Sequence, residues 1–441
     1  MAADRRSFLM ASAAMAALAA LPEAAATRPA GSRFPAGFLW GAATAGHQVE
    51  GNNTASDTWF LEHLKPTVFA EPSGDACNSL ELWSEDLDLV KHLGLNSYRF
   101  SIEWARIEPE PGAYSTAMLD HYARIIEGCR QRGLTPLVTF NHFTTPRWFA
   151  AGGGWLDPQS PDLFARYCER AARHLAAHIG FATTLNEPNI MGVLRWFGLP
   201  PAMWEAQRAM LAAAARALQV PTFAAANALN LEDLGRQQTN LLAAHRRGRE
   251  AIKSVRPDLK VGVSLAISDD QAVGSDSRRD AKRAEVYGAW LDAARDDDFI
   301  GVQNYDRAQI GPAGALPPPE GAPRNSMGAE IYPPSLGGAV RYAHAATGRP
   351  VMITEHGLGT ADDTQRAAFI PAALTGLKAA IDDGVPVLGY MHWSLLDNFE
   401  WIFGYGPKYG LVAVDRATFR RTPKPSAAVY ARIAGRNEVI S

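Results

Sequence analysis

Short apolar runs rich in Val, Ile, Phe and Tyr recur along the chain and alternate with longer stretches of helical periodicity. Such runs predict buried strands, and the amphipathic stretches between them predict helices. The eight expected strands cover residues 38–44, 96–102, 135–142, 181–187, 260–267, 298–305, 350–357 and 387–394. Three clear helices are expected over 79–94, 118–133 and 160–180. Each of these ends at a glycine shortly before the next strand, which is a common C-terminal stop.

Eight strands alternating with helices predict the α/β class, as a single (β/α)8 TIM barrel over residues 27–441 with elaborated loops at its C-terminal face. A doubly wound sheet would also alternate, but no Gly-rich phosphate loop follows the first strand. The Ala-rich segment 190–240 and the Pro/Gly-rich segment 308–330 interrupt the regular rhythm after the fourth and sixth strands. We therefore expect both segments to form rim or lid elements on the face that carries the site.

Polar and aromatic side chains gather at the C-terminal ends of six expected strands, namely Arg99, Asn141, His142, Asn186, Glu187, Gln303, Tyr305, Glu355 and Trp393. The corresponding ends of barrel strands meet on one face, where active sites are built. One such residue would mean little, because a lone Glu is more often a salt-bridged side chain at the rim. Six strands contributing together predict an active site.

Glu187 in "TLNEPN" and Glu355 in "ITEHG" end the fourth and seventh expected strands. Two carboxyl groups facing each other across a pocket suit glycoside chemistry, in which one is protonated to donate and the other is ionised. Arg99 could pair with a carboxylate and lower its pKa. Tyr305 could hydrogen-bond the same carboxylate, and Asn186 could hold a sugar hydroxyl.

The stretches "FLWGAATAGHQVEG", "YRFSIEWARIEPEPG", "TLNEPN", "ITEHG" and "WSLLDNFEW" resemble glycoside hydrolase family 1, which includes β-glucosidases and β-galactosidases. The resemblance runs from about Phe34 to about Tyr430. It implies a retaining mechanism with Glu355 as nucleophile and Glu187 as general acid/base. Arg99 and Tyr305 fall on the positions that support the nucleophile.

The resemblance also implies a set of sugar-binding residues: Gln48, His142, Asn186, Glu400 and Trp401 as hydroxyl partners, and Trp393 as a platform beneath the ring. Gln303 stands where an Asn is usual, and three further departures from the family pattern are Phe143, His356 and Phe403. The intact "FEW" favours a neutral sugar over a 6-phosphorylated one, with Lys408 and Tyr409 as the opposing signal. His356 is either a harmless substitution or a titrating group beside the nucleophile.

The function implied is an exo-acting β-glycosidase, above all a β-glucosidase, with galactose and fucose as alternative sugars. A transglycosylase would use the same intermediate, and a carbohydrate-binding pseudoenzyme would normally have lost one of the two glutamates. An endo-acting glycanase would need an open cleft rather than residues that grip terminal hydroxyls. The expected partner is a small β-glycoside or short oligosaccharide.

Charge and the spacing of cysteines and histidines bear on whether the chain binds nucleic acid, a metal or another cofactor. A net charge of -3 without a long basic run gives no support for nucleic-acid binding. The three cysteines lie far apart, and His142 has no second ligand at metal spacing, so neither a metal nor another cofactor is expected.

The N-terminus carries a targeting pattern. "DRRSFLM" and the Ala-rich run after it resemble a twin-arginine signal peptide over residues 1–26. The sequence therefore predicts a periplasmic or secreted bacterial protein with no membrane span in its mature form.

Overall fold

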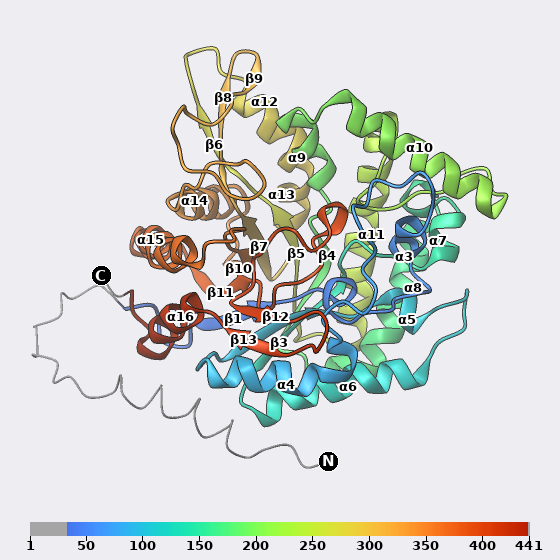
Figure 1. The fold of residues 1–441 in the computed structure, drawn as a ribbon, viewed down its shortest axis with the longest axis horizontal. Coiled ribbons are helices and arrows are strands. Elements are labelled where there is room, and N and C mark those ends of the chain that lie inside the picture. The colour runs from blue at the N-terminus through green and yellow to red at the C-terminus, as the bar shows by residue number, and fades with distance from the viewer. Residues whose placement is uncertain (1–32, 440–441) are drawn as a thin grey trace, which may run out of the picture. The chain divides into compact units, whose positions relative to one another are not determined.

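The computed structural model describes residues 33–439 of the chain, and residues 34–439 belong to one compact unit. Eight parallel strands close into a barrel in the order β1-β11-β10-β7-β5-β4-β3-β2 (Figure 1). Their bounds are β1 Leu39–Ala43, β2 Ser97–Ser101, β3 Thr135–Asn141, β4 Phe181–Asn186, β5 Lys260–Ala266, β7 Phe299–Asn304, β10 Val351–His356 and β11 Val387–Trp393. Each of them lies within one of the eight expected strands, so the TIM barrel prediction is confirmed.

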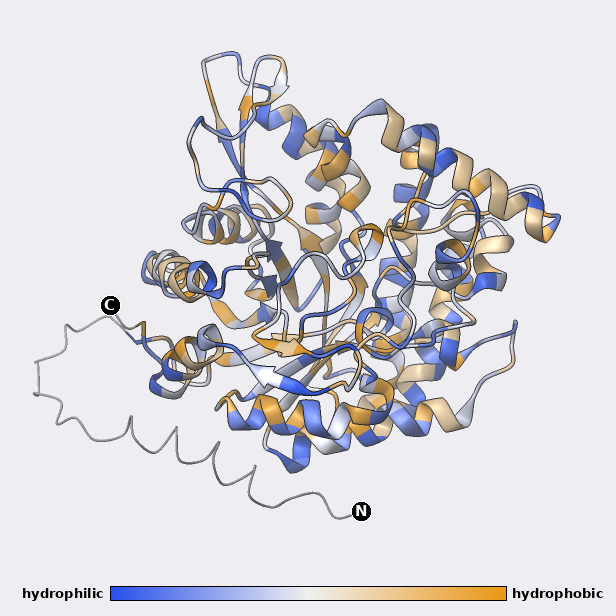
Figure 2. Ribbon diagram, in the orientation of Figure 1, coloured by the Kyte–Doolittle hydropathy of each residue, from blue (hydrophilic) through white to orange (hydrophobic). Residues whose placement is uncertain are grey.

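Helices cover the outside of the barrel, with their apolar faces inward and their polar faces outward (Figure 2). The longer ones are α4 Ser79–His92, α6 Thr116–Gln131, α8 Ser160–Leu175, α10 Pro201–Leu218, α11 Leu234–Val255, α14 Ser335–Thr347, α15 Asp363–Asp382 and α16 Pro425–Arg436. The first three confirm the clearest predicted helices. Gly94 and Gly133, just beyond α4 and α6, take φ values of 69° and 71°, which explains why the chain can turn there.

Shorter helices join these elements or lie over the barrel. They are α2 Gly46–Val49, α3 Asp57–Glu62, α5 Trp104–Ile107, α7 Arg147–Ala151, α9 Ile190–Phe197, α12 Arg279–Arg283 and α13 Ala289–Ala294. Single turns of 3-10 helix occur at η1 Gly154–Leu156, η2 Ala176–His178, η3 Leu231–Asp233 and η5 Trp401–Phe403, and η4 Ala284–Gly288 is a π-helical turn.

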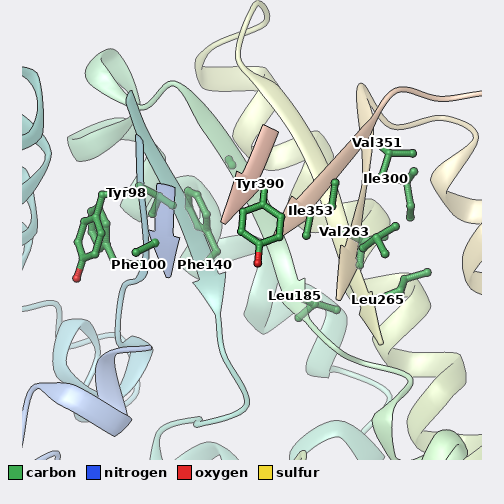
Figure 3. Close-up of a cluster of buried hydrophobic side chains, with 14 of the residues drawn as sticks. Tyr98, Phe100, Phe140, Leu185, Val263, Leu265, Ile300, Val351, Ile353 and Tyr390 are labelled. Carbon is green, nitrogen blue, oxygen red and sulfur yellow. The ribbon is translucent and has the colours of Figure 1, made fainter. Parts of the chain in front are cut away.

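The buried core has two layers because successive side chains of a strand point to opposite faces. The outer layer lies between strands and helices and includes Tyr98, Phe140, Val263, Ile353 and Tyr390 (Figure 3). The inner layer fills the barrel with Leu137, Phe181, Phe299, Met352 and Met391. Phe181 of β4 and Phe299 of β7 meet with ring centroids 5.7 Å apart although β5 separates their strands, which places both rings inside.

The two segments that interrupt the alternation of strands and helices agree with their predictions to different degrees. Segment 190–240 contains α9, α10, η3 and the start of α11, so the helical prediction there is confirmed. Segment 308–330 is only partly loop. Strands β8 Arg307–Gly311 and β9 Gly314–Ala315 join β6 Asp269–Ala272 in a three-stranded sheet. The neighbouring barrel strands β5 and β7 continue outward into β6 and β8, which pair in parallel, and this continuation overrides the Pro/Gly-rich composition. Strands β12 Val412–Val414 and β13 Arg421–Pro423 form a second small sheet.

Two expectations from the sequence concern a signal peptide at the N-terminus and the absence of a membrane span. The predicted signal peptide over residues 1–26 lies outside the described residues. Within residues 33–439 no helix is long and apolar enough to cross a bilayer.

All three cysteines are buried free thiols. Burial raises the pKa of Cys77 and of Cys129 to about 12, and it raises the pKa of Cys168 well above its ordinary value. The thiolate is the reactive form of cysteine, so these side chains act as small apolar core residues.

One glycine gives a direct test of the inner layer. A Cβ on Gly262 of β5 would lie 2.3 Å from the Phe299 carbonyl oxygen, whereas a Cβ on Gly435 of α16 meets nothing within 4 Å. We expect Gly262→Ala to destabilise the fold by about 1–3 kcal/mol through overpacking. Gly435→Ala, the same substitution on an exposed helix, should be neutral or stabilising. Thermal unfolding of both variants checks this, and equal stability would contradict the close packing at β5.

Candidate active site

The Glu355 carboxylate at the end of β10 is held from two sides. Arg99 of β2 donates from Nη1 to Glu355 Oε1 at 2.5 Å. The Tyr305 hydroxyl, one residue beyond β7, donates to Glu355 Oε2 at 2.7 Å. Arg99 is fully buried and Glu355 nearly so. The structure therefore brings Arg99 and Tyr305, the two residues that the sequence grouped around one carboxylate, into contact with Glu355.

Asn186 at the end of β4 links the carboxylate cluster to the pocket wall. Its Oδ1 accepts hydrogen bonds from Arg99 Nη2 at 2.6 Å and from Gln303 Nε2 at 2.7 Å. Its Nδ2 lies 3.2 Å from His142 Nε2. With both acceptor directions occupied, the amide is held in one orientation, and Gln303 is integrated into the site as its sequence position predicted.

Glu187 directly follows β4, with a φ of 44° that places it apart from the regular strand. Burial raises the pKa of Glu187 well above its ordinary value, and the negative charge of Glu355 raises it further, against the opposing charge of Arg99. Among the described residues, no side chain donates a hydrogen bond to the Glu187 carboxyl group. The charge of the Arg99 guanidinium, which makes no hydrogen bond to Glu187, is therefore the main influence that favours the ionised form of Glu187.

The pKa of Glu355 is also raised above its ordinary value, but several neighbouring groups oppose the rise. Burial raises its pKa, but the Arg99 charge and hydrogen bonds from Tyr305, Arg99 and Gln303 all lower it. When two coupled carboxyl groups share one proton, the proton resides where the ionised form is least stabilised. The pair is therefore arranged with Glu187 protonated and Glu355 ionised.

The expected sugar-binding residues line the same end of the barrel. Gln48 is buried and donates from Nε2 to the Phe399 carbonyl at 2.7 Å, and the Trp393 and His142 rings stack with centroids 5.7 Å apart. His142 in turn lies nearly parallel to Trp401, at 6.0 Å and 16°. Burial and the charge of Glu355 raise the pKa of Glu400 to about 8, opposed by a hydrogen bond from Trp393.

Three buried polar atoms of these predicted residues have no hydrogen-bond partner within residues 33–439: Gln48 Oε1, His142 Nδ1 and Gln303 Oε1. Buried polar atoms are nearly always paired in folded proteins, so exceptions that gather at one place indicate binding groups. An amide oxygen and an imidazole nitrogen are suitable partners for hydroxyl groups.

His142 is an uncharged imidazole in this site. Burial and the nearby Arg99 charge lower its pKa well below the ordinary value, so the ring is neutral. No group of three or more His, Cys, Asp or Glu side chains in the described part of the chain could hold a metal ion.

The sequence left open whether His356 is a titrating group beside Glu355, and its surroundings decide this. It is fully buried, its Nδ1 lies 2.8 Å from the Tyr390 hydroxyl, and its ring stacks on Phe369 of α15. The side chain thus faces the helical layer, while Glu355 faces the pocket. Burial lowers the pKa of His356 to about 3, so it adds no titrating group near neutral pH.

The remaining departures from the family pattern, Phe143 and Phe403, lie in different surroundings, as do Lys408 and Tyr409. Phe143 takes a φ of 67° and packs edge-on against Trp401 at 5.2 Å. Phe403 is 45% exposed, so it lies on the surface of the loop after β11. Lys408 donates to the Tyr405 carbonyl at 2.7 Å, and Tyr409 packs edge-on against Tyr305.

Sequence reasoning missed Glu103, which lies just beyond β2 and is buried. Its carboxylate accepts hydrogen bonds from Thr144 Oγ1 at 2.6 Å and from Asn53 Nδ2 at 2.8 Å. It thereby ties the loop after β3 to the segment after α2. The rule that flagged the other residues, a polar side chain at the end of a barrel strand, would have found it too.

A TIM barrel with a buried, oppositely protonated carboxyl pair on its C-terminal face is the framework of a glycoside hydrolase. Comparison with family models agrees, since the model for glycosyl hydrolase family 1 matches residues 30–309 and 318–439. The chain belongs to glycosyl hydrolase family 1. The short unmatched stretch, residues 310–317, begins in β8 and ends two residues beyond β9.

Individual relatives are similar over nearly the whole chain. β-Glucosidase A of Thermotoga maritima is 29% identical, covering 92% of this chain and 98% of the relative. Among solved structures, β-glycosidase BGL167 is 50% identical with a TM-score of 0.87, covering 92% of this chain and 98% of that one. The apo structure of β-glucosidase 1317 is 44% identical with the same TM-score, covering 90% and 98%.

The pKa of Glu187 provides a test of the arrangement. Because the charge of Glu355 raises the pKa of Glu187, Glu355→Gln should lower it, and pH titration of the labelled carboxyl groups by ¹³C NMR measures the change. Glu400→Gln is the matched control, since Glu400 acts in the same direction but more weakly. An unchanged or higher pKa of Glu187 in Glu355→Gln would contradict the coupling.

Proposed function

We propose that this glycoside hydrolase is an exo-acting β-glucosidase that retains anomeric configuration. The observation that carries the proposal is the Glu355 carboxylate, fixed by Arg99 and Tyr305 beside a carboxyl group that keeps its proton. The names of the relatives, β-glucosidase and β-glycosidase, support the choice of substrate class. The substrate is a small β-glycoside or short oligosaccharide.

In the first step, a Glu355 oxygen attacks the anomeric carbon while the bond from that carbon to the aglycone oxygen breaks. Glu187 gives its proton to the departing oxygen, so the aglycone leaves as a neutral alcohol. A covalent glycosyl-enzyme remains. Arg99 and Tyr305 orient the attacking carboxylate and keep it ionised before the attack.

In the second step, water attacks the anomeric carbon and Glu187, now ionised, takes a proton from it. The bond to Glu355 breaks, and the sugar leaves with its original β configuration. Once Glu355 is esterified its charge is gone, and the pKa of Glu187 falls, because that charge is one of the causes that raise it. The same residue therefore serves as acid and then as base.

The sugar-binding residues favour a neutral terminal sugar. Gln48, His142 and Asn186 supply neutral hydrogen-bonding groups, and Trp393 and Trp401 supply flat aromatic faces. Lys408 is engaged with a backbone carbonyl of its own loop rather than with the pocket residues named above. A neutral glucoside fits this set better than a 6-phosphorylated one.

Hydrolysis of an aryl β-glycoside panel tests the proposal. Wild-type enzyme should hydrolyse the β-glucoside, with the β-galactoside and β-fucoside measuring how the sugar is selected. Glu355→Gln should lower kcat by several orders of magnitude, because it removes the nucleophile. Wild-type turnover by Glu355→Gln would sink the assignment.

The acid/base role is separated by azide rescue. Glu187→Ala should regain turnover of an activated aryl glucoside when azide is added, because azide needs no general base, and the product should be the β-glycosyl azide. An α-azide would contradict retention. Gly435→Ala, on the exposed face of α16, serves as the control with unchanged kinetics.

We further propose that the protein is exported through the twin-arginine route to the periplasm or beyond. The support is the pair Arg5-Arg6 ahead of "SFLM" and the short apolar run that follows. This route carries proteins that have already folded.

Replacing Arg5 and Arg6 with Lys tests the route in a bacterial host. The variant should be retained in the cytoplasm, whereas the wild type should reach the periplasm, as measured by immunoblots of cell fractions. Arg28→Lys, just after the predicted signal peptide, should leave export intact. Unchanged export of the double-Lys variant, or cytoplasmic retention of the wild type, would refute the proposal.

A further inference from the structure

Trp401 has an unusual backbone for a bulky residue. Its φ of 50° lies in the left-handed region, which costs free energy for any residue with a large side chain. Such a conformation persists only where the surroundings determine it. Its neighbour in space, Phe143, also has a positive φ and packs edge-on against the indole. The question is what fixes the plane of the Trp401 ring.

His47 provides a face for that ring. The imidazole lies almost parallel to the Trp401 indole, with centroids 5.9 Å apart and an interplanar angle of 5°. His47 is 1% exposed and belongs to α2, the short helix that follows β1. It also meets the edge of Phe399 at 6.1 Å, so it is packed on more than one side.

Hydrogen bonds hold the imidazole in its own plane. Its Nε2 lies 2.8 Å from Glu62 Oε1, and its Nδ1 lies 3.4 Å from Asn53 Nδ2. The amide nitrogen of Asn53 also donates to Glu103, so it faces His47 as a donor. His47 Nδ1 is then the acceptor, and Nε2 carries the hydrogen that is donated to Glu62. This arrangement fixes both the tautomer and the ring orientation.

Glu62 connects back to the loop that carries Trp401. Its second oxygen, Oε2, accepts from the Ser73 backbone N–H at 2.9 Å and from the Ser73 hydroxyl at 2.8 Å. The Ser73 carbonyl in turn accepts from the Tyr405 hydroxyl, four residues beyond Trp401. A backbone hydrogen bond from Ala70 to the Ile402 carbonyl, 3.0 Å long, joins the same two segments.

We propose that His47 is a positioning residue that fixes the indole plane of Trp401, and thereby the direction of its N–H toward a hydroxyl of the bound sugar. The inference rests on the proposed function, because it gives Trp401 a sugar to bind. No side chain within residues 33–439 accepts the indole N–H, so that donor is available for a ligand. His47 itself does not touch the substrate in this role.

A purely structural buried histidine would behave differently. It would contribute to stability, and its removal would affect every kinetic parameter only through the amount of folded enzyme. A positioning residue instead changes how tightly the sugar is held, and its effect depends on the presence of Trp401. This dependence separates the two roles.

A double-mutant cycle measures the dependence. On an aryl β-glucoside, His47→Leu should lower kcat/KM roughly 3- to 10-fold, mainly through KM, because it removes the flat face against the indole. In a Trp401→Ala background the same substitution should have almost no further effect. An equal fold-loss in both backgrounds, or wild-type kinetics for folded His47→Leu, would overturn the inference.

Two further variants keep the test decisive. His47→Phe keeps a flat ring but loses the hydrogen bond to Glu62. Its KM should lie closer to the wild-type value than the KM of His47→Leu does. It also provides the test if His47→Leu folds poorly. His121→Leu, the same change at a buried histidine on α6, should leave KM unchanged. If His47→Phe is no better than His47→Leu, the flat face is not what matters and the inference fails.

The outcome is distinguishable from a failure of the proposed function. Wild-type enzyme without β-glucosidase activity would refute the proposed function itself. Active wild-type enzyme with additive effects would refute only the role of His47. A crystal structure of His47→Leu adds a readout without substrate, since the Trp401 indole should rotate or show two orientations, whereas an unmoved ring would contradict the proposal.

Discussion

The buried guanidinium of Arg99 is the constraint on which the rest of the site depends. A cation inside a barrel must be balanced by an anion and by hydrogen-bond acceptors, or the fold loses several kcal/mol. Glu355, the Asn186 amide and the Thr354 carbonyl provide that balance. One requirement of burial therefore favours the ionised Glu355 carboxylate, fixes the orientation of the Asn186 amide and sets the position of β10 relative to β2.

Several residues around this centre have a strained backbone, which sets the direction of their side chains. Phe143, Glu187 and Trp401 each follow or lie beyond a barrel strand, and each has a positive φ without being glycine. Such residues cost of order 1–3 kcal/mol each and are stable only because packing on all sides determines them. The rings of Phe143, His142 and His47 around Trp401 show how aromatic contacts supply that packing.

The sequence predicted what depends on local pattern. Apolar runs and glycine stops located all eight barrel strands, and the polar strand ends located Glu187, Glu355, Arg99 and Tyr305. It did not predict the β6–β8–β9 sheet, because that pairing comes from the direction of neighbouring barrel strands and not from composition. It also missed contacts between distant segments, such as Glu62 with His47. The outward direction of His356 was within reach, since alternation along β10 places it opposite Glu355.

The three buried thiols have a consequence for where the chain can acquire its structure. The fold needs no disulfide, so it can be completed in a reducing compartment without an oxidant or an isomerase. Transfer to an oxidising compartment would then change little, because buried thiols with raised pKa values hold almost no thiolate to react. The three thiols therefore make no demand on the redox conditions in which the fold forms.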